Sequence, residues 1–190
     1  GSEMCIRDSC GTNGKTTINN LLCSTLEGQG KKVICNHSGS NMLNGAIAAF
    51  VLSAKWNGKI DADYACIEVD EASTLRIFPH FKPDYMILNN LFRDQLDRYG
   101  EIDHTQEVIA HALELSPTTT LIYNADDPLC ASIAARVPNA SIAFGIDGAT
   151  DTESDRISDS RFCSQCNAPL EYDYVQYGHC LLYTSPSPRD

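Results

Sequence analysis

The sequence predicts an α/β fold, in which a mostly parallel sheet is covered by helices on both faces. Short apolar strand patterns alternate with longer helical patterns along most of the chain, which is typical of parallel sheets. A glycine-rich segment at residues 11–17 opens the first helical pattern. The polar motifs follow strand ends, where ligands bind in such sheets. We therefore expect a phosphate-binding α/β domain of the P-loop type.

The helices are predicted from apolar residues at three- and four-residue spacing. Gly28 and Gly30 end the first helix, Asp103 can cap the third, and residues 128–137 form a fourth. The residues that make these patterns are Ile18, Leu21, Leu22 and Leu26, then Leu43, Ala46, Ile47, Phe50, Val51 and Ala54, then Val108, Ala112 and Leu115. Strands are expected at residues 32–36, 64–69, 85–88, 120–123 and 141–144.

Composition excludes several classes of function. The net charge of −11 disfavours general nucleic-acid binding, and no apolar run approaches the roughly 20 residues that span a bilayer. The N-terminus has no signal-peptide pattern. The nine cysteines are an odd number, and four of them lie in apolar segments, which indicates buried, reduced thiols and a cytoplasmic protein. These four are Cys23, Cys35, Cys66 and Cys130.

The chain divides into four parts. Residues 10–148 form the predicted ATP-binding domain, and residues 149–179 form a polar, acidic linker followed by a cysteine pair. Residues 1–9 contain no clear strand and residues 180–190 lack periodicity. We interpret both ends as foreign to the natural gene, such as sequencing-adaptor read-through. A frayed natural terminus is the alternative.

The glycine-rich segment has the chemistry of a phosphate-binding loop. Its glycines allow close approach to an anion, and the N–H groups that start the next helix point at it. Lys15 would neutralise the β- and γ-phosphates of ATP, and Thr16 would ligate Mg²⁺. The strict P-loop motif fails because Ser9 replaces its first glycine. The alternative is a chance glycine turn. The expected nucleotide-binding residues here are Gly11, Thr12, Asn13, Gly14, Lys15, Thr16 and Thr17.

Three further polar motifs follow strand patterns. Glu68 is a candidate Mg²⁺ ligand, or else a solvated strand-end acid. Residues 89–100 carry opposite charges that suggest an ordered polar site, with a surface salt-bridge cluster as the alternative. Asn124 could read an adenine edge, whereas Asp126 and Asp127 could equally cap the next helix.

Cys163 and Cys166 have the spacing of half a tetrahedral zinc site. A four-cysteine ribbon needs a second pair, and Cys180 stands alone. We expect an inserted partial zinc ribbon. Two incidental or redox thiols are the alternative.

The string G-T-N-G-K-T-T at residues 11–17 resembles the phosphate loop of the Mur ligases and of folylpolyglutamate synthase. The resemblance implies a Mur ligase central domain, with Glu68 in the place of a magnesium-holding glutamate. Residues 89–100 resemble the family's N-x-x-R-D-H-x-D-x-x-G, except that Gln95 replaces its metal-ligating histidine. Ile109 replaces a carbamylated lysine, which puts the usual second metal in doubt. The roles implied are catalytic for Lys15, Glu68, Arg93 and Asp94, nucleotide-binding for Asn90, Asn124 and Asp127, and Mg²⁺-binding for Thr16, Glu68 and Gln95.

Within the Mur ligases, residues 38–45, 161–174 and 177–179 are similar to the MurT type, the ligase subunits of lipid II isoglutaminyl synthase. That resemblance implies a bacterial cytoplasmic enzyme that uses ATP, Mg²⁺ and a structural Zn²⁺. It would activate the D-glutamate α-carboxylate of lipid II for amidation by ammonia from a GatD-like glutamine amidotransferase. The chain alone is expected to be inactive, because Mur ligases close a C-terminal domain over ATP. The alternatives are folylpolyglutamate synthase or an amino-acid-adding Mur ligase, a P-loop ATPase switch or kinase, and a non-catalytic zinc module.

Overall fold

The main sheet contains six parallel strands in the order β2-β3-β1-β4-β5-β6. The computed structural model describes residues 5–10, 14–36, 41–91, 101–145, 171–176 and 179–184, with side chains at 14–36, 41–91 and 104–145. The strands are β1 (Cys5–Cys10), β2 (Val33–Cys35), β3 (Tyr64–Glu68), β4 (Tyr85–Leu88), β5 (Thr120–Asn124) and β6 (Ser141–Phe144). The predicted parallel sheet is confirmed.

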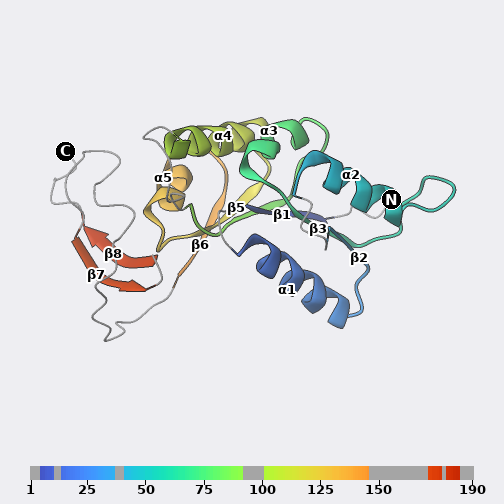
Figure 1. Ribbon diagram of the computed structural model, residues 1–190, viewed down its shortest axis with the longest axis horizontal. Helices are drawn as coiled ribbons and strands as arrows, with labels where there is room; N and C mark the ends of the chain where they lie inside the picture. The colour runs from blue at the N-terminus through green and yellow to red at the C-terminus, as the bar shows by residue number, and fades with distance from the viewer. Residues whose placement is uncertain are drawn as a thin grey trace.

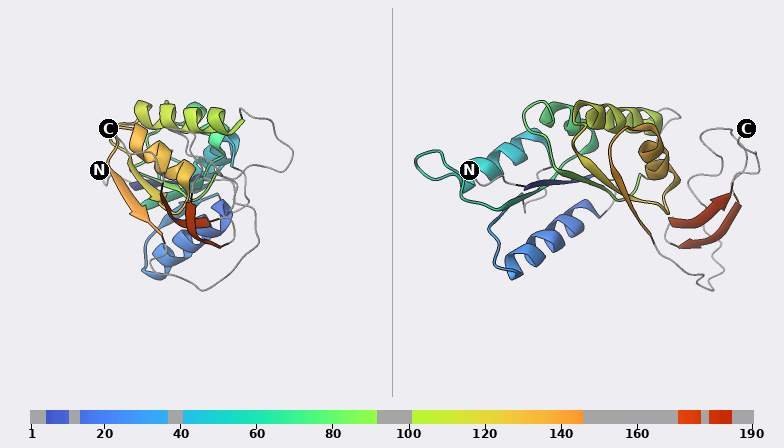
Figure 2. Two further views of the ribbon diagram at one scale, coloured as in Figure 1. Left: turned by 90° about the vertical axis from the view of Figure 1, so that its left-hand side faces the viewer. Right: turned by 180° about the vertical axis from the view of Figure 1, so that it is seen from behind.

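Helices cover both faces of this sheet. Helix α1 lies on one face, and the other α-helices lie on the opposite face (Figures 1 and 2). The helices are α1 (Lys15–Gly28), α2 (Leu43–Ser53), the short 3-10 helix η1 (Glu71–Ser73), α3 (Thr74–Ile77), α4 (Glu101–Leu115) and α5 (Pro128–Arg136). The expected layered arrangement is therefore confirmed.

The first strand corrects one expectation for the N-terminus, while the origin of this segment stays a prediction. Residues 1–9 were expected to contain no clear strand, yet β1 forms between β3 and β4 at the centre of the sheet. Its register places Ser9 opposite Glu68 and Cys10 opposite Leu88. Pairing on both edges fixes a segment whose sequence has weak strand character.

The strand order places a topological switch point at the carboxyl ends of β1 and β4, where open α/β sheets form a ligand-binding crevice. From β1 the chain passes through α1 on one face to β2, whereas from β4 it passes through α4 on the other face to β5. Ligands of open α/β sheets bind where neighbouring connections diverge in this way. The glycine-rich loop follows β1, so the topology brings it to this crevice.

The buried face of α1 differs from the expected one. Cys23 and Leu26 are buried as part of the core, but so is the polar Asn19, whereas Leu21 is 67% exposed. The apolar residues in this helix therefore do not all point inward. A polar side chain in the buried stripe indicates that α1 packs partly through hydrogen bonds.

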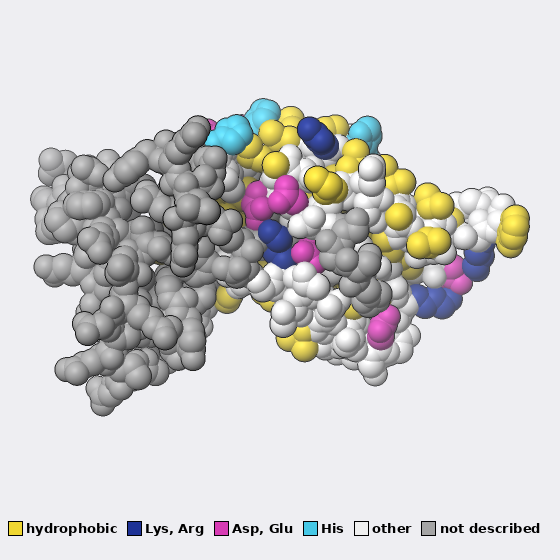
Figure 3. All heavy atoms as spheres, viewed as in Figure 1, with side chains coloured by type: hydrophobic (Ala, Val, Ile, Leu, Met, Phe, Trp, Pro, Cys, Tyr) yellow, Lys and Arg dark blue, Asp and Glu magenta, His cyan; other side chains and the backbone are white. Residues whose placement is uncertain are grey.

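Helix α2 also departs from its predicted face. Ala46 and Ala49 are buried, while Ile47 and Val51 are 50% and 65% exposed. Figure 3 shows hydrophobic side chains exposed over this helix, at the right of the view. Small residues allow α2 to pack closely, and Leu43 and Phe50 are partly buried against the core as predicted, whereas Ile47 and Val51 face outward.

Helix α4 begins earlier than predicted, so Asp103 lies inside it and not at its cap. Ile109, Ala112 and Leu113 are fully buried in the core, whereas Leu115 is 41% exposed. Ile109 occupies the position at which the resemblance to the Mur ligases would place a carbamylated lysine. Its place in the core gives that position a packing role.

Two antiparallel strands follow the main domain: β7 (Glu171–Gln176) and β8 (His179–Thr184). They form a separate sheet, seen in red at one end of Figure 1. Residues 180–190 were described as lacking periodicity, yet residues 180–184 form most of β8 through pairing with β7. Cys163 and Cys166 lie outside the described residues, so the zinc ribbon stays a prediction.

Cys23, Cys66 and Cys130 are buried as predicted, and among the residues with described side chains no disulfide joins them. Cys35 is only half-buried. A hydrogen bond from Cys23 lowers the pKa of Cys35, against the effect of burial. No helix in the described ranges is both long enough and apolar enough to cross a membrane.

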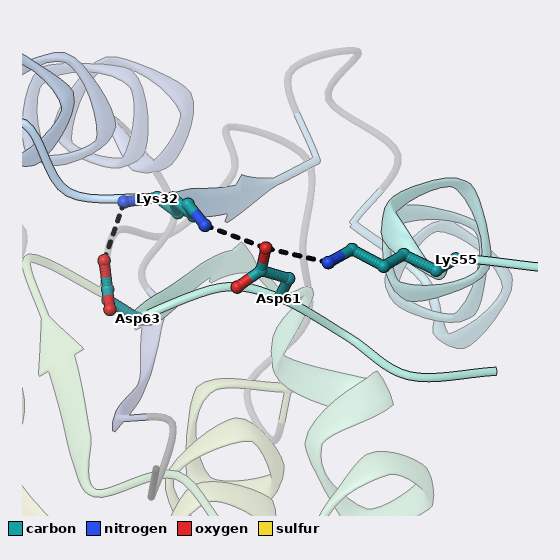
Figure 4. Close-up of polar contacts among 4 residues, drawn as sticks. All are labelled: Lys32, Lys55, Asp61 and Asp63. Carbon is teal, nitrogen blue, oxygen red and sulfur yellow. Dashed lines mark hydrogen bonds and ion pairs between the residues drawn. The ribbon is translucent and has the colours of Figure 1, made fainter. Parts of the chain in front are cut away.

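A group of charged side chains lies at the amino ends of β2 and β3, away from the carboxyl ends of the strands (Figure 4). Asp61 Oδ2 accepts hydrogen bonds from Lys32 Nζ at 2.8 Å and Lys55 Nζ at 2.9 Å. The Asp63 carboxylate accepts the Lys32 backbone N–H at 2.9 Å. These contacts connect the start of β2 to the segment that enters β3.

We expect Asp61 to titrate well below a free aspartate, because Lys32 and then Lys55 lower its pKa from 3.8 to about 2. A depressed carboxyl pKa stabilises the fold above the unfolded value and loses that effect as the pH falls towards 2. NMR titration of the Asp61 carboxyl carbon measures this pKa. It should move towards 3.8 in Lys32→Ala and in high salt, which screens exposed pairs. A pKa that stays near 2 in that variant would contradict the assignment to Lys32.

Candidate active site

The crevice begins with the turn into α1. Gly14 has φ = 81°, a conformation that favours glycine. A Cβ at this position would lie 3.1 Å from Asn89 Nδ2, so the turn also passes close to the residue after β4. Among the described residues, no side chain caps the N-terminus of α1, and no acidic residue lies in its first turn. The first N–H groups of a helix attract anions, so this end of α1 suits a phosphate group. Gly11, Thr12 and Asn13 lie outside the described residues.

Lys15 is a cation at the start of α1. Its Nζ donates to Glu71 Oε1 at 2.9 Å, and the two side chains are only 12% and 16% exposed. Burial and the Glu71 carboxylate raise the pKa of Asp70, while Lys15 opposes this effect. Figure 3 shows acidic and basic side chains meeting near the middle of the visible face. The lysine therefore lies among the acids that follow β3.

Glu68 ends β3 and is 3% exposed. Its Oε2 is buried and has no hydrogen-bond partner among the described residues. A buried carboxylate oxygen without a partner is costly unless a cation or donor reaches it. Because Ser9 pairs with Glu68 and leads into the glycine-rich loop, the carboxylate comes from the strand adjacent to that loop.

This arrangement fits Mg²⁺ bound together with a phosphate. Magnesium sites usually combine one or two carboxylates with substrate phosphates and water, without a complete protein cage. Accordingly, Glu68 Oε2 would be a protein ligand, and Thr16, in the first turn of α1, could supply a hydroxyl. Within the described ranges, no group of three or more His, Cys, Asp or Glu residues has the geometry of a metal site.

The segment after β4 reaches the same edge of the sheet. Asn90 is 2% exposed there, one residue beyond Asn89. The backbone N–H of Leu91 donates to Asp127 Oδ2 at 2.9 Å, which ties this segment to the start of α5. Arg93, Asp94 and Gln95 lie outside the described residues, so their catalytic and metal-binding roles stay predictions.

Asn124 and Asp127 have structural contacts in addition to their predicted nucleotide roles. Asp127 is the N-cap of α5, and its Oδ1 accepts from Leu129 N at 2.8 Å and Cys130 N at 3.1 Å. Asn124 Oδ1 accepts from Asp126 N at 3.0 Å in a local turn. The helix-cap alternative is therefore observed for Asp127. Contact with a nucleotide stays a prediction for both residues.

Replacing Asp127 with alanine should lower the free energy of unfolding by about 2–3 kcal/mol, because a helix cap is lost and the buried Leu91 N–H is left unpaired. Urea denaturation measures this change. Asp127→Asn should have a smaller effect, because its amide oxygen can still cap α5. An unchanged urea midpoint in Asp127→Ala would show that other groups replace these contacts.

The sequence interpretation did not identify two buried amides near the site, Asn19 and Asn36. It also gave no partner to Lys15, which pairs with Glu71. Asn19 Nδ2 donates to Asn36 Oδ1 at 3.2 Å. One available signal was a polar residue within an otherwise apolar helix stripe, four residues after Lys15.

Comparison of the sequence with known proteins identifies the family of this chain. Residues 10–177 match the family described as the Mur ligase middle domain. The chain is 36% identical over 174 residues to the "Lipid II isoglutaminyl synthase (glutamine-hydrolyzing) subunit MurT" of Staphylococcus aureus, and 34% identical over 173 residues to that of Streptococcus pneumoniae. Each match covers 91% of this chain and 38% of the relative. The chain thus spans well under half the length of these relatives.

Solved structures share the fold. The MurF structure from Acinetobacter baumannii superposes with a TM-score of 0.63, at 18% identity over 75% of this chain and 31% of that one. A UDP-N-acetylmuramoyl-L-alanyl-D-glutamate–2,6-diaminopimelate ligase gives 0.60, at 18% identity over 89% of this chain and 35% of that one. These similarities support the architecture described above.

Proposed function

Because this chain belongs to the Mur ligase family and contains its middle domain, we propose that it is the nucleotide-binding part of an ATP-dependent carbon–nitrogen ligase of peptidoglycan synthesis. Two features together carry the proposal. One is the N-terminal end of α1, which suits a phosphate group, and the other is Glu68, whose buried Oε2 has no hydrogen-bond partner among the described residues. A helix N-terminus and a carboxylate across a crevice are what Mg²⁺ and a triphosphate require together.

Each residue has a role in this proposal. Lys15 leaves Glu71 and neutralises the phosphate oxygens, while the N–H groups at the start of α1 hold the β-phosphate. Thr16 and Glu68 hold Mg²⁺, which supplies charge neutralisation on the transferring phosphoryl group. Positioning and electrostatic stabilisation account for most of the catalysis in such transfers. The predicted catalytic roles of Arg93 and Asp94 and the predicted Mg²⁺-binding role of Gln95 belong to the same proposal.

The reaction proceeds in two steps. An acceptor carboxylate attacks the γ-phosphorus, the bond to the bridging oxygen breaks, and ADP leaves with that electron pair. An amine then adds to the acyl phosphate, and the tetrahedral intermediate collapses with loss of inorganic phosphate and a proton. Both steps need precise placement of carboxylate and amine, which the rest of the protein would supply.

The similarity to two MurT subunits favours one substrate and one partner. The carboxylate is the α-carboxyl of D-glutamate in lipid II, and the amine is ammonia from a GatD-like glutamine amidotransferase. The enzyme would work in the bacterial cytoplasm, with Cys163 and Cys166 contributing to a structural Zn²⁺ site. An amino-acid-adding Mur ligase or a folylpolyglutamate synthase is the nearest alternative, and a P-loop ATPase switch is a more distant one.

Steady-state ATP consumption by the full-length protein distinguishes these functions. The proposal expects ADP release only when lipid II is present with ammonium, or with glutamine and the amidotransferase subunit. Mass spectrometry should then detect the amidated stem peptide. ADP release without an acceptor would indicate a switch ATPase. Release that requires a free amino acid would indicate an amino-acid-adding ligase.

A further inference from the structure

The buried amide Asn36 lies directly after β2 and contacts the backbone of Glu68 twice. Its Nδ2 donates to the Glu68 carbonyl oxygen at 2.8 Å, and its Oδ1 accepts the Glu68 N–H at 2.8 Å. Asn36 is 5% exposed. Because β2 ends at Cys35, the side chain of Asn36 takes the place of a further rung of the parallel ladder.

The chemistry of these contacts requires a carboxamide. The Glu68 N–H can only donate and its carbonyl can only accept, so the partner must offer one acceptor and one donor side by side. Aspartate at position 36 would direct an oxygen at the Glu68 carbonyl, and an apolar side chain would leave both backbone groups unpaired. Burial makes either loss costly.

The same amide is connected to the phosphate-binding helix. Asn36 Oδ1 also accepts from Asn19 Nδ2 at 3.2 Å, and Asn19 Nδ2 lies 3.3 Å from Cys35 Sγ. Asn19 is 2% exposed and lies about one turn after Lys15 on α1. A continuous buried path therefore joins α1, the end of β2 and the backbone of Glu68.

We propose that Asn36, supported by Asn19, is a positioning residue for the magnesium ligand Glu68. It holds the backbone of Glu68 at a fixed distance from the N-terminal end of α1, so that one buried carboxylate and one nucleotide phosphate meet the same cation. This inference rests on the proposed function, and it adds two residues that do not touch nucleotide or metal. Partners that orient metal ligands typically change metal affinity about 10- to 100-fold when they are removed.

Isothermal titration with a non-hydrolysable ATP analogue, in saturating Mg²⁺ and in EDTA, tests this inference on the full-length protein. The measured quantity is the ratio of the two affinities. In Asn36→Ala and Asn36→Asp we expect this ratio to fall by about tenfold or more, while the affinity in EDTA changes little. Asn19→Ala should lower the ratio less, because it leaves both contacts to Glu68 in place.

Asn139 provides a matched control. It is 7% exposed, and its Nδ2 donates to the backbone carbonyls of Ser116 at 2.9 Å and Thr119 at 3.0 Å. Both carbonyls precede β5, at the edge of the sheet away from Glu68. Asn139→Ala should lower the melting temperature, as should the Asn36 variants, but it should leave the Mg²⁺ ratio at the wild-type value.

These outcomes distinguish failure of the positioning role of Asn36 from failure of the proposed function. A wild-type protein whose nucleotide affinity is independent of Mg²⁺ would overturn the proposed function and this inference with it. If the wild type depends on Mg²⁺ and folded Asn36 variants keep the wild-type ratio, the positioning role is wrong while the proposed function stands. Equal losses in the Asn36 and Asn139 variants would also overturn it. Should Asn36→Ala fail to fold, the same criteria apply to Asn36→Asp and Asn19→Ala.

Discussion

Replacing Lys15 with alanine should weaken binding of an ATP analogue by about 30-fold or more, because truncating one partner of a poorly solvated charge contact costs roughly 2–5 kcal/mol. Lys15 is 12% exposed, so water replaces its charge poorly. Isothermal titration in Mg²⁺ measures the loss. Lys55→Ala is the matched control, since Lys55 also pairs with one carboxylate but is 59% exposed.

The same substitution has a second expected signature in the ligand-free protein. Without Lys15, the Asp70 and Glu71 carboxylates lose the nearby cation, so the raised pKa of Asp70 should rise further. A raised carboxyl pKa means that the folded state binds protons more tightly, so stability increases as the pH falls through that range. Lys15→Ala should therefore lose most stability at neutral pH and recover part of it under mildly acidic conditions. If Lys15→Ala binds the nucleotide with wild-type affinity, Lys15 does not contribute to the nucleotide site.

Local sequence patterns were sufficient to predict a strand or helix where its apolar run is bounded by polar residues. The strand at Tyr85–Leu88 was predicted at its observed bounds, and α5 was predicted to within one residue. Each is specified by its own segment, through period-two or helical spacing. The alternation of such segments was also sufficient to predict the parallel sheet.

Elements that depend on distant partners were not predictable in this way. β1 has a polar sequence and forms through pairing with β3 and β4, more than fifty residues away. Lys15 pairs with a residue 56 positions later, and Glu68 contacts Asn36 across 32 positions. The candidate site was predictable where a motif carries its own chemistry, as in Lys15 and Glu68. A polar residue in an apolar helix stripe marks Asn19 as unusual, but nothing in the local sequence indicates what Asn19 or Asn36 contacts.

Replacing Glu68 with leucine should separate stability from function. The carboxylate is buried, and its Oε2 has no hydrogen-bond partner among the described residues. An apolar side chain of similar size removes that desolvated charge, so the free energy of unfolding should stay unchanged or rise by up to about 1–2 kcal/mol. Urea denaturation of the ligand-free protein measures this quantity.

Nucleotide binding by Glu68→Leu should respond in the opposite direction. Loss of a direct magnesium ligand should lower the ratio of ATP-analogue affinities in Mg²⁺ and in EDTA by about 100-fold or more. This loss is larger than the one expected for an outer partner such as Asn36. Binding in EDTA should persist, because the helix end and Lys15 are intact. Glu68→Gln, which keeps the shape and one oxygen, should retain part of the enhancement. If Glu68→Leu instead unfolds easily, the carboxylate has a stabilising partner in the native protein, and its buried oxygen is explained without a metal ion.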